Sequence, residues 1–326
     1  MKAIKFFAIT AMAAAMITSC STDDELSQSN YPSDNIIRVT AGVNNAKTRA
    51  EGAGTEMKND FSLTIVNKNA PKYTYTDKVF SKKSGDWACS ETLLWQKSDA
   101  LVDIVAFAPA QTGKFNGVYA DGSIQPITYS VADDQSTKSD NNDLLYYYAK
   151  DFNPGTSLDK GKLNIQFNHA FCMIDINVTL GTEFNKPSIP TTSPIIKVTL
   201  GGTKIAANVN VTNAASVVTA SGEATATDIT TTNGSFTTAA DPEKNAISRF
   251  SCIAIPQTVG ANTFKVSLMT AGKRYEWTSA EPVELKSGYR YTLKLSMGND
   301  VVLLKGGGIT ATPWTEITSD KPLETD

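Results

Sequence analysis

The stretch LNIQFNHAFCMIDINVTL, residues 163–180, decides the fold class, because its apolar side chains alternate with polar ones. A period of two places every second side chain on one buried face of a β-strand. The apolar residues first fall on odd positions and then on even ones: Leu163, Ile165 and Phe167, followed by Ile174, Ile176, Val178 and Leu180. A strand cannot change phase without an irregularity, so we expect a bulge or bend near residues 171–173.

Shorter runs of the same kind fill the rest of the chain, and clusters of Gly, Pro, Asn and Asp separate them. Such spacing is typical of an all-β sandwich or barrel. Residues 36–43 and 61–66 alternate, whereas residues 101–108 are more continuously apolar, with Asp103 the one charged residue, as in a strand covered on both faces. Residues 181–240 predict two strands, at 195–200 and 206–211, within long loops. No segment beyond the N-terminal leader shows the period of a helix.

Length and turn residues predict two domains. The chain has 326 residues, which is more than a single core of ordinary size requires. The turn-rich stretch Asp151-Phe152-Asn153-Pro154-Gly155 comes shortly before residue 163. We therefore expect an N-terminal β-sandwich over residues 50–158 and a C-terminal one over residues 159–326.

The first 19 residues have the order of a secretory signal peptide: Lys2 and Lys5 precede an apolar run over residues 6–17. This run is shorter than the roughly 20 residues that a membrane-spanning helix needs. The run Ile17-Thr18-Ser19-Cys20 resembles a bacterial lipobox, in which the cysteine is lipidated and becomes the new N-terminus. Cys20 is thus the predicted lipidation site, and its lipid the only expected contact with a membrane. Residues 21–25 resemble an acidic outer-surface signal, and residues 26–33 read as a polar tether.

Composition argues against several classes of function. The net charge is -3 and no basic cluster occurs, so we expect no nucleic acid as a partner. His169 is the only histidine, and its place beside Phe167 and Phe171 favours a structural, packed ring over a catalytic one. The spacing of this histidine and the cysteines matches no usual zinc site. We therefore predict no catalytic residue, metal or cofactor, and no enzymatic activity.

Four local features leave alternatives open. Cys172 and Cys252 are predicted in strands of the second domain and form either a disulfide or two buried thiols. An acidic loop around residues 133–143 is either solvated or a calcium ligand set, although its spacing differs from an EF-hand. The aromatic residues Tyr146–148, Trp87 and Trp95 either pack in the core or form a sugar-stacking face. The glycines at 306–308 read as a connector.

Several motifs recur in an order that resembles the fimbrillin family, the type V pilins. They are LNIQFNH at residues 163–169, IAIPQT at 253–258, SGYRYTL at 287–293 and the short strand at 309–314. On the N-terminal side, Thr48-Arg49-Ala50 is similar to the maturation site of the family. The resemblance covers nearly the whole chain.

The resemblance implies two tandem transthyretin-like β-sandwiches, export as an outer-membrane lipoprotein precursor and cleavage by a trypsin-like protease after Arg49. Cleavage would make Ala50 the first residue and remove residues 20–49, a lipidated propeptide that includes the strand at 36–43. An open apolar groove with unpaired backbone groups would remain, and a strand of another fimbrial subunit would fill it. The mature chain would then be a stalk, accessory or tip subunit of a surface fimbrium.

The role within the fimbrium and any adhesion ligand, such as a host surface or glycan, stay open at this level. The alternative is a surface lipoprotein that keeps its lipid and acts as a fimbrial anchor or glycan-binding protein.

Overall fold

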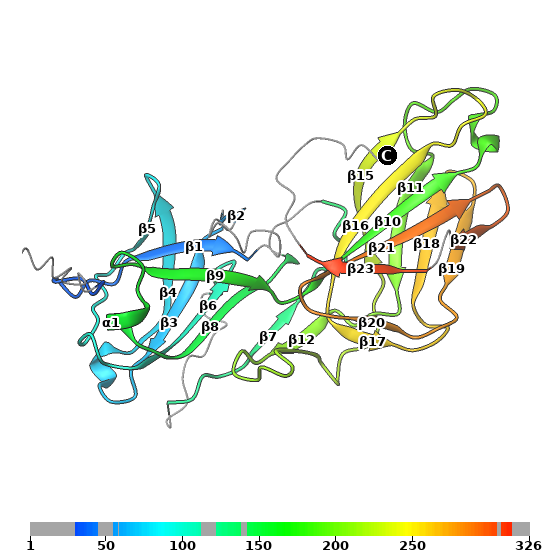
Figure 1. Ribbon diagram of the computed structural model, residues 1–326. Coiled ribbons are helices and arrows are strands. Elements are labelled where there is room, and N and C mark those ends of the chain that lie inside the picture. Colours follow the sequence, from blue (N-terminus) through cyan, green and yellow to red (C-terminus); the bar gives the residue numbers. More distant parts are fainter. Residues whose placement is uncertain are drawn as a thin grey trace, which may run out of the picture.

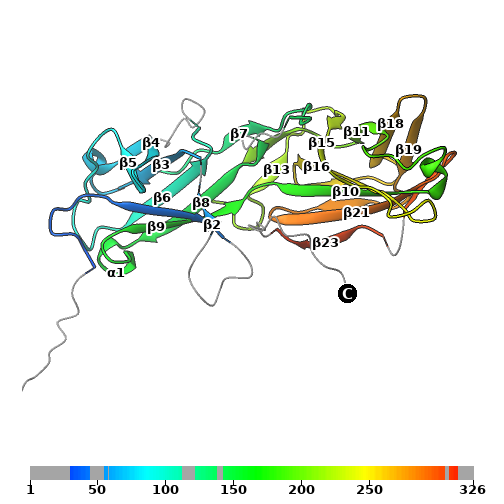
Figure 2. The ribbon, with the colours of Figure 1, turned by 90° about the horizontal axis from the view of Figure 1, so that it is seen from above.

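The computed structural model describes residues 30–44, 55–57, 59–111, 122–137, 142–304 and 308–314. Strands dominate it and form two lobes that lie end to end (Figures 1 and 2). The predicted all-β sandwich class is confirmed. The signal peptide and the predicted processing residues Cys20, Arg49 and Ala50 lie outside the described residues, as do Gly306 and Gly307.

An eight-stranded sheet forms the N-terminal lobe. Its strands, in spatial order, are β2 (Thr55–Glu56), β1 (Val39–Val43), β9 (Leu163–His169), β8 (Leu145–Phe152), β6 (Val102–Ala108), β3 (Phe61–Val66), β4 (Tyr75–Lys83) and β5 (Asp86–Cys89). β1 also lies against β5, so the sheet curls over an apolar core (Figure 1). Near the centre of this core, the Phe61 ring stacks on Phe80 and meets Phe167 edge-on.

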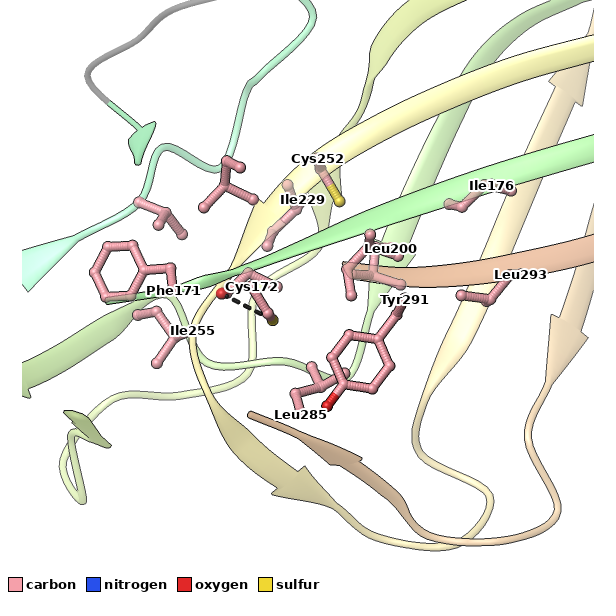
Figure 3. Close-up of a cluster of buried hydrophobic side chains, with 14 of the residues drawn as sticks. Phe171, Cys172, Ile176, Leu200, Ile229, Cys252, Ile255, Leu285, Tyr291 and Leu293 are labelled. Carbon is pink, nitrogen blue, oxygen red and sulfur yellow. Dashed lines mark hydrogen bonds between the residues drawn. The ribbon is translucent and has the colours of Figure 1, made fainter. Parts of the chain in front are cut away.

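Two larger sheets form the C-terminal lobe. One contains β15 (Thr232–Thr237), β16 (Ile247–Ala254), β10 (Cys172–Leu180), β21 (Tyr289–Met297), β22 (Val302–Leu304) and β23 (Thr310–Pro313), the last two both paired with β21. The other contains β14 (Ile229–Thr230), β11 (Ile195–Gly201), β18 (Lys265–Thr270) and β19 (Arg274–Thr278). Side chains from both, such as Ile176 and Leu200, meet in one core (Figure 3). A two-stranded sheet joins β17 (Gln257–Val259) to β20 (Val283–Leu285).

The core of the C-terminal lobe continues across the junction between the lobes. A three-stranded sheet joins β7 (Ile127–Ser130) to β12 (Ala206–Val209) and β13 (Val218–Ala220). Strand β6 is buried at every position, Asp103 included, as its largely apolar run predicts. Its Ile104 and Ala106 face the N-terminal core, whereas Val105 and Phe107 belong to the larger core. The two cores are therefore separated by little more than the thickness of one sheet.

The bend predicted near residues 171–173 is confirmed at Ala170 and Phe171, but it does not interrupt a single strand. β9 ends at His169 in the N-terminal sheet, and β10 begins at Cys172 in a C-terminal sheet. The change of phase thus marks the passage of the chain from one core to the other. The domain boundary at 158/159 stays a prediction; β9, which follows it, pairs with β1 and β8.

One sequence expectation is wrong in part. Residues 181–240 hold β13, β14 and β15 besides β11 and β12, because Thr and Val, which are β-branched, suit strands even in a polar segment. Short helical turns also occur: α1 (Pro154–Ser157) and the 3-10 turns at Pro71–Tyr73 and Thr182–Asn185. The Asn153 side chain accepts a hydrogen bond from Gly155 N–H and caps α1. One turn is too short to show helical periodicity in a sequence.

Truncation of Phe61 tests the N-terminal core. We expect Phe61→Ala to lower the free energy of unfolding by roughly 3–5 kcal/mol, because a fully buried ring that contacts three other aromatic rings is lost. Urea denaturation followed by circular dichroism measures the change. Leu303→Ala, at a side chain that is 59% exposed, is the control and should change stability little. Equal effects of the two substitutions would contradict this description of the core.

Candidate functional site: strand β1 in its slot

Strand β1 lies between β9, to which it runs parallel, and β2, to which it runs antiparallel (Figure 1). Five residue pairs join it to β9, from Val39 with Leu163 to Val43 with Phe167. Beyond the last pair, Asn44 N–H donates to the Phe167 carbonyl over 2.8 Å. β1 is therefore a full member of the sheet.

The segment just before β1 has a different partner. Ile36 bridges Leu94, Ile37 N–H donates to the Leu93 carbonyl over 2.9 Å, and Trp95 N–H donates to the Asn35 carbonyl over 2.8 Å. The strand predicted at residues 36–43 thus exists, but its first part pairs with the chain that follows β5. Together the two pairings hold residues 35–44 by backbone hydrogen bonds, first to residues 93–95 and then to β9.

Burial of alternate side chains adds to this attachment. Ile37, Val39 and Val43 are buried in the N-terminal core, whereas Arg38 and Thr40 face solvent. Each buried aliphatic side chain contributes roughly 1.5–3 kcal/mol relative to an exposed one. The slot that receives β1 therefore selects an extended segment with an apolar residue at every second position.

The slot depends on β1 for its hydrogen bonding. Within the described residues, β1 is the only strand that pairs with β9 over Leu163–Phe167, because β8 joins β9 only at Asn168 and His169. Without β1, the outward backbone groups of β9 would lose their partners, and an apolar trough would open beside them. An extended segment of matching pattern would restore both interactions. The sequence did not predict β2 or the parallel pairing of β1 with β9.

The predicted processing residues fall in the connection between β1 and β2. Asn44 is the last described residue after β1, and β2 begins at Thr55, so Arg49 and Ala50 lie between two neighbouring strands. Cys20 precedes the described chain. A break after Arg49 would separate β1 from the rest of the molecule covalently and leave it held by the contacts above.

His169 ends β9 and is 4% exposed. Its Nδ1 lies 2.7 Å from Asp143 Oδ2, and its ring stacks on Trp314, with centroids 3.8 Å apart and planes 12° apart. Nε2 has no hydrogen-bond partner among the described residues. The ring packs as a structural histidine, and no hydroxyl or thiol of the described residues is hydrogen-bonded to it. The contact with Trp314, 145 positions away, left no signal in the sequence.

The two buried cysteines are unpaired thiols. In the ladder between β10 and β16, Cys172 faces Ala254, whereas Cys252 faces Ile174. The Cys172 thiol donates to the Ala254 carbonyl over 3.2 Å (Figure 3). Burial raises the pKa of both thiols, so they stay protonated and unreactive in the folded chain.

The aromatic candidates take part in packing. Trp95 is buried and stacks on Phe152, and Trp87 meets Phe61 edge-on. Tyr147 packs against the N-terminal core, and Tyr146 and Tyr148 pack against the larger one. They alternate along β8, so the three rings form no common face.

The described part of the acidic loop makes local hydrogen bonds, and residues 138–141 lie outside the described residues. Asp133 Oδ1 accepts from Asp134 N–H, and Asp134 Oδ1 from Ser136 N–H. Among the described residues, no three side chains of His, Cys, Asp or Glu gather as a metal site. No described helix is long and apolar enough to cross a membrane.

Comparison with known proteins points to one family. The sequence model of the fimbrillin-like family matches residues 48–314. No protein with a curated description matches the sequence.

Similar solved structures include a candidate cell adhesion protein from Bacteroides ovatus ATCC 8483, with 16% identity and a TM-score of 0.62 over 86% of this chain and 98% of that one. A fimbrial protein from Bacteroides vulgatus ATCC 8482 shares 16% identity, with a TM-score of 0.54 over 86% of this chain and 99% of that one. At these identities the likeness concerns the fold.

Adjacent substitutions test how the slot holds β1. We expect Val39→Asp to lower the free energy of unfolding by at least about 3 kcal/mol, because it places an unpaired charge in the core. Thr40→Asp, at the next residue on the exposed face, should change it by well under about 1 kcal/mol. Urea denaturation of the chain that retains residues 20–49 measures both. If Thr40→Asp were the more harmful, the register of β1 would be wrong.

Thiol reactivity tests the state of the cysteines in the chain that carries Cys20→Ser. Ellman's reagent should react with half-buried Cys89 in the native chain, and with Cys172 and Cys252 only after denaturation, because burial hinders access and raises their pKa. Cys89→Ser is the control and should abolish the native reaction. A denatured chain that releases no further thiols would indicate a disulfide instead.

Proposed function

Because the chain belongs to the fimbrillin-like family, we propose that it is the precursor of a stalk, accessory or tip subunit that assembles by donor-strand exchange. At the coarser level, family membership makes it an exported fimbrial protein of the cell surface that assembles with other fimbrial subunits, and not an enzyme. The proposal adds three steps: lipidation at Cys20, cleavage after Arg49, and replacement of β1 by a strand of another subunit.

The observation that carries the proposal is the position of β1 in its slot. β1 is the sole ladder partner of Leu163–Phe167 among the described residues, and it belongs to the predicted propeptide at residues 20–49. The family match begins at residue 48, after β1 and beside Arg49, which also supports removal of this strand. A donor strand would recover the backbone pairing of β9 and the burial that Ile37, Val39 and Val43 provide.

The physical consequence is a precursor that cannot polymerise early. While β1 occupies the slot, an incoming strand must displace an intramolecular one, which has a large effective concentration. Cleavage after Arg49 makes β1 a separate chain, so that its loss becomes irreversible once it diffuses away. The proposed lipid on Cys20 would hold the precursor at the membrane until that moment.

Substitution of Arg49 tests the proposal in cells. We expect the wild-type protein in surface fimbriae to begin at Ala50, and Arg49→Ala to be exported but to accumulate as a lipidated precursor that does not enter fibres. N-terminal sequencing and mass spectrometry of surface fractions measure both results. Lys47→Ala is the matched control, since it removes a nearby basic residue that the proposed site does not use.

Two outcomes would contradict the proposal. Assembly of Arg49→Ala at the wild-type level would mean that removal of β1 at this site is not the switch. A mature wild-type protein that still begins at lipidated Cys20 would favour the alternative, a fimbrial anchor or glycan-binding lipoprotein.

A further inference from the structure

Strand β23 is held on the sheet by few side chains. Four residue pairs join it to β21, but all four of its own residues, Thr310–Pro313, are exposed. The buried residue at this end comes immediately afterwards: Trp314 is 7% exposed, and its backbone N–H donates to the Gly288 carbonyl over 2.7 Å. The indole is therefore the main apolar attachment at this end of the strand.

The platform for this indole belongs to the other lobe. Trp314 stacks face to face on His169, the last residue of β9, and Asp143 holds the imidazole through Nδ1. A ring pair of this kind contributes more than its buried area alone. The position of β23 therefore depends on where the end of β9 places the His169 ring.

The end of β9 is held by β8 and, from the other side, supported by β1. At its end β9 pairs with β8 through Asn168 and His169, and Ala170 N–H donates to the Leu144 carbonyl over 2.8 Å. The five preceding residues of β9 pair with β1 alone among the described strands. β1 also reaches beyond its own last pair, because Asn44 Nδ2 donates to Asn168 Oδ1 over 2.8 Å. This hydrogen bond lies one residue from the imidazole that carries Trp314.

The other side of the β23 ladder is fixed independently. β21 pairs in parallel with β10 over eight residues, and the Arg290 guanidinium forms an ion pair with Asp175 across these strands. Arg290 lies opposite Thr312 of β23. A change at β9 would therefore loosen β23 and leave β21 in place.

We propose that the stack of Trp314 on His169 is a latch that couples the seating of β23 to the presence of β1. With β1 in its slot, β9 is paired along its length, the imidazole is fixed and β23 stays on β21. Loss of β1 leaves β9 paired only with β8, at Asn168 and His169, and removes the hydrogen bond from Asn44 to Asn168. The platform is then held by fewer contacts, and β23 detaches more often. A role for this latch during assembly rests on the proposed removal of β1. The coupling between β1 and β23 is a property of the uncleaved chain.

Coupling between two elements is reciprocal in free energy, which makes the latch testable from both ends. Weakening β1 should expose the backbone of β23, and removing the indole should loosen β9. A merely structural tryptophan would change the protection of β23 alone.

Native-state hydrogen exchange with mass spectrometry on the uncleaved full chain carrying Cys20→Ser measures both directions. In His169→Ala and Trp314→Ala we expect exchange at β23 and at residues 289–292 to rise about tenfold, and exchange at β9 to rise as well. In Val43→Ala, which trims a buried contact of β1, exchange should rise in β9 and β23 together. His169→Phe retains an aromatic platform and should restore much of the protection that His169→Ala loses.

Val266→Ala trims an equally buried valine of β18 and should leave β9 and β23 unchanged. Asn44→Ala alters an exposed residue, so it tests the same link if Val43→Ala fails to fold.

Faster exchange in β9 without any change in β23, or unchanged exchange in β9, would overturn the latch. So would an equal rise in β18 and β19, which would mean unfolding of the whole chain. Because no variant is cleaved, these results do not depend on processing at Arg49.

Discussion

The backbone groups of β9 between Leu163 and Phe167 need a hydrogen-bonding partner, and among the described strands only β1 supplies one. An unpaired strand edge beside an apolar trough is unstable in water, because both its polar and its apolar groups lack suitable contacts. The N-terminal lobe therefore requires an extended segment in this slot. The described chain provides that segment itself, from residues that precede the predicted processing site.

The parallel orientation of β1 and β9 has a further consequence. Parallel neighbours cannot be joined by a tight turn, so the chain between them has to build most of the lobe before β9 is added. β1 is therefore remote from β9 in sequence although it pairs with it in space. Such a strand can be removed while β3, β4, β5, β6 and β8 keep their pairings with one another, whereas β2, which pairs with β1 alone among the described strands, would lose its partner.

The bend at Ala170 and Phe171 links this slot to the C-terminal lobe. β9 and β10 are consecutive along the chain but belong to different sheets, so the end of β9 lies where the two lobes meet. There His169 contacts Trp314, the last described residue. The larger core also includes Val105 and Phe107 of β6, a strand of the N-terminal sheet. The lobes are thus connected by packing as well as by the chain.

Local pattern in the sequence determined which residues form strands and which faces are buried. The alternation in residues 163–180 predicted the buried side chains of β9 and β10, and the apolar run at 101–108 predicted a strand covered on both faces, because side-chain period and burial are local properties. The family resemblance rested on such motifs and is confirmed over residues 48–314. The short Thr-rich strands after residue 210 escaped prediction, since their side chains are mostly exposed and leave little apolar alternation.

Only the tertiary structure decided which strands are neighbours. That β1 pairs with β9 in parallel, that residues 93–95 receive the segment before it, and that Trp314 rests on His169 follow from the joint packing of distant segments. Alternation specifies the face that a strand buries. The backbone donors and acceptors, however, are the same along every strand and do not specify which strand becomes the partner. The shape of the two cores selects the partner, and this shape exists only once the chain has folded.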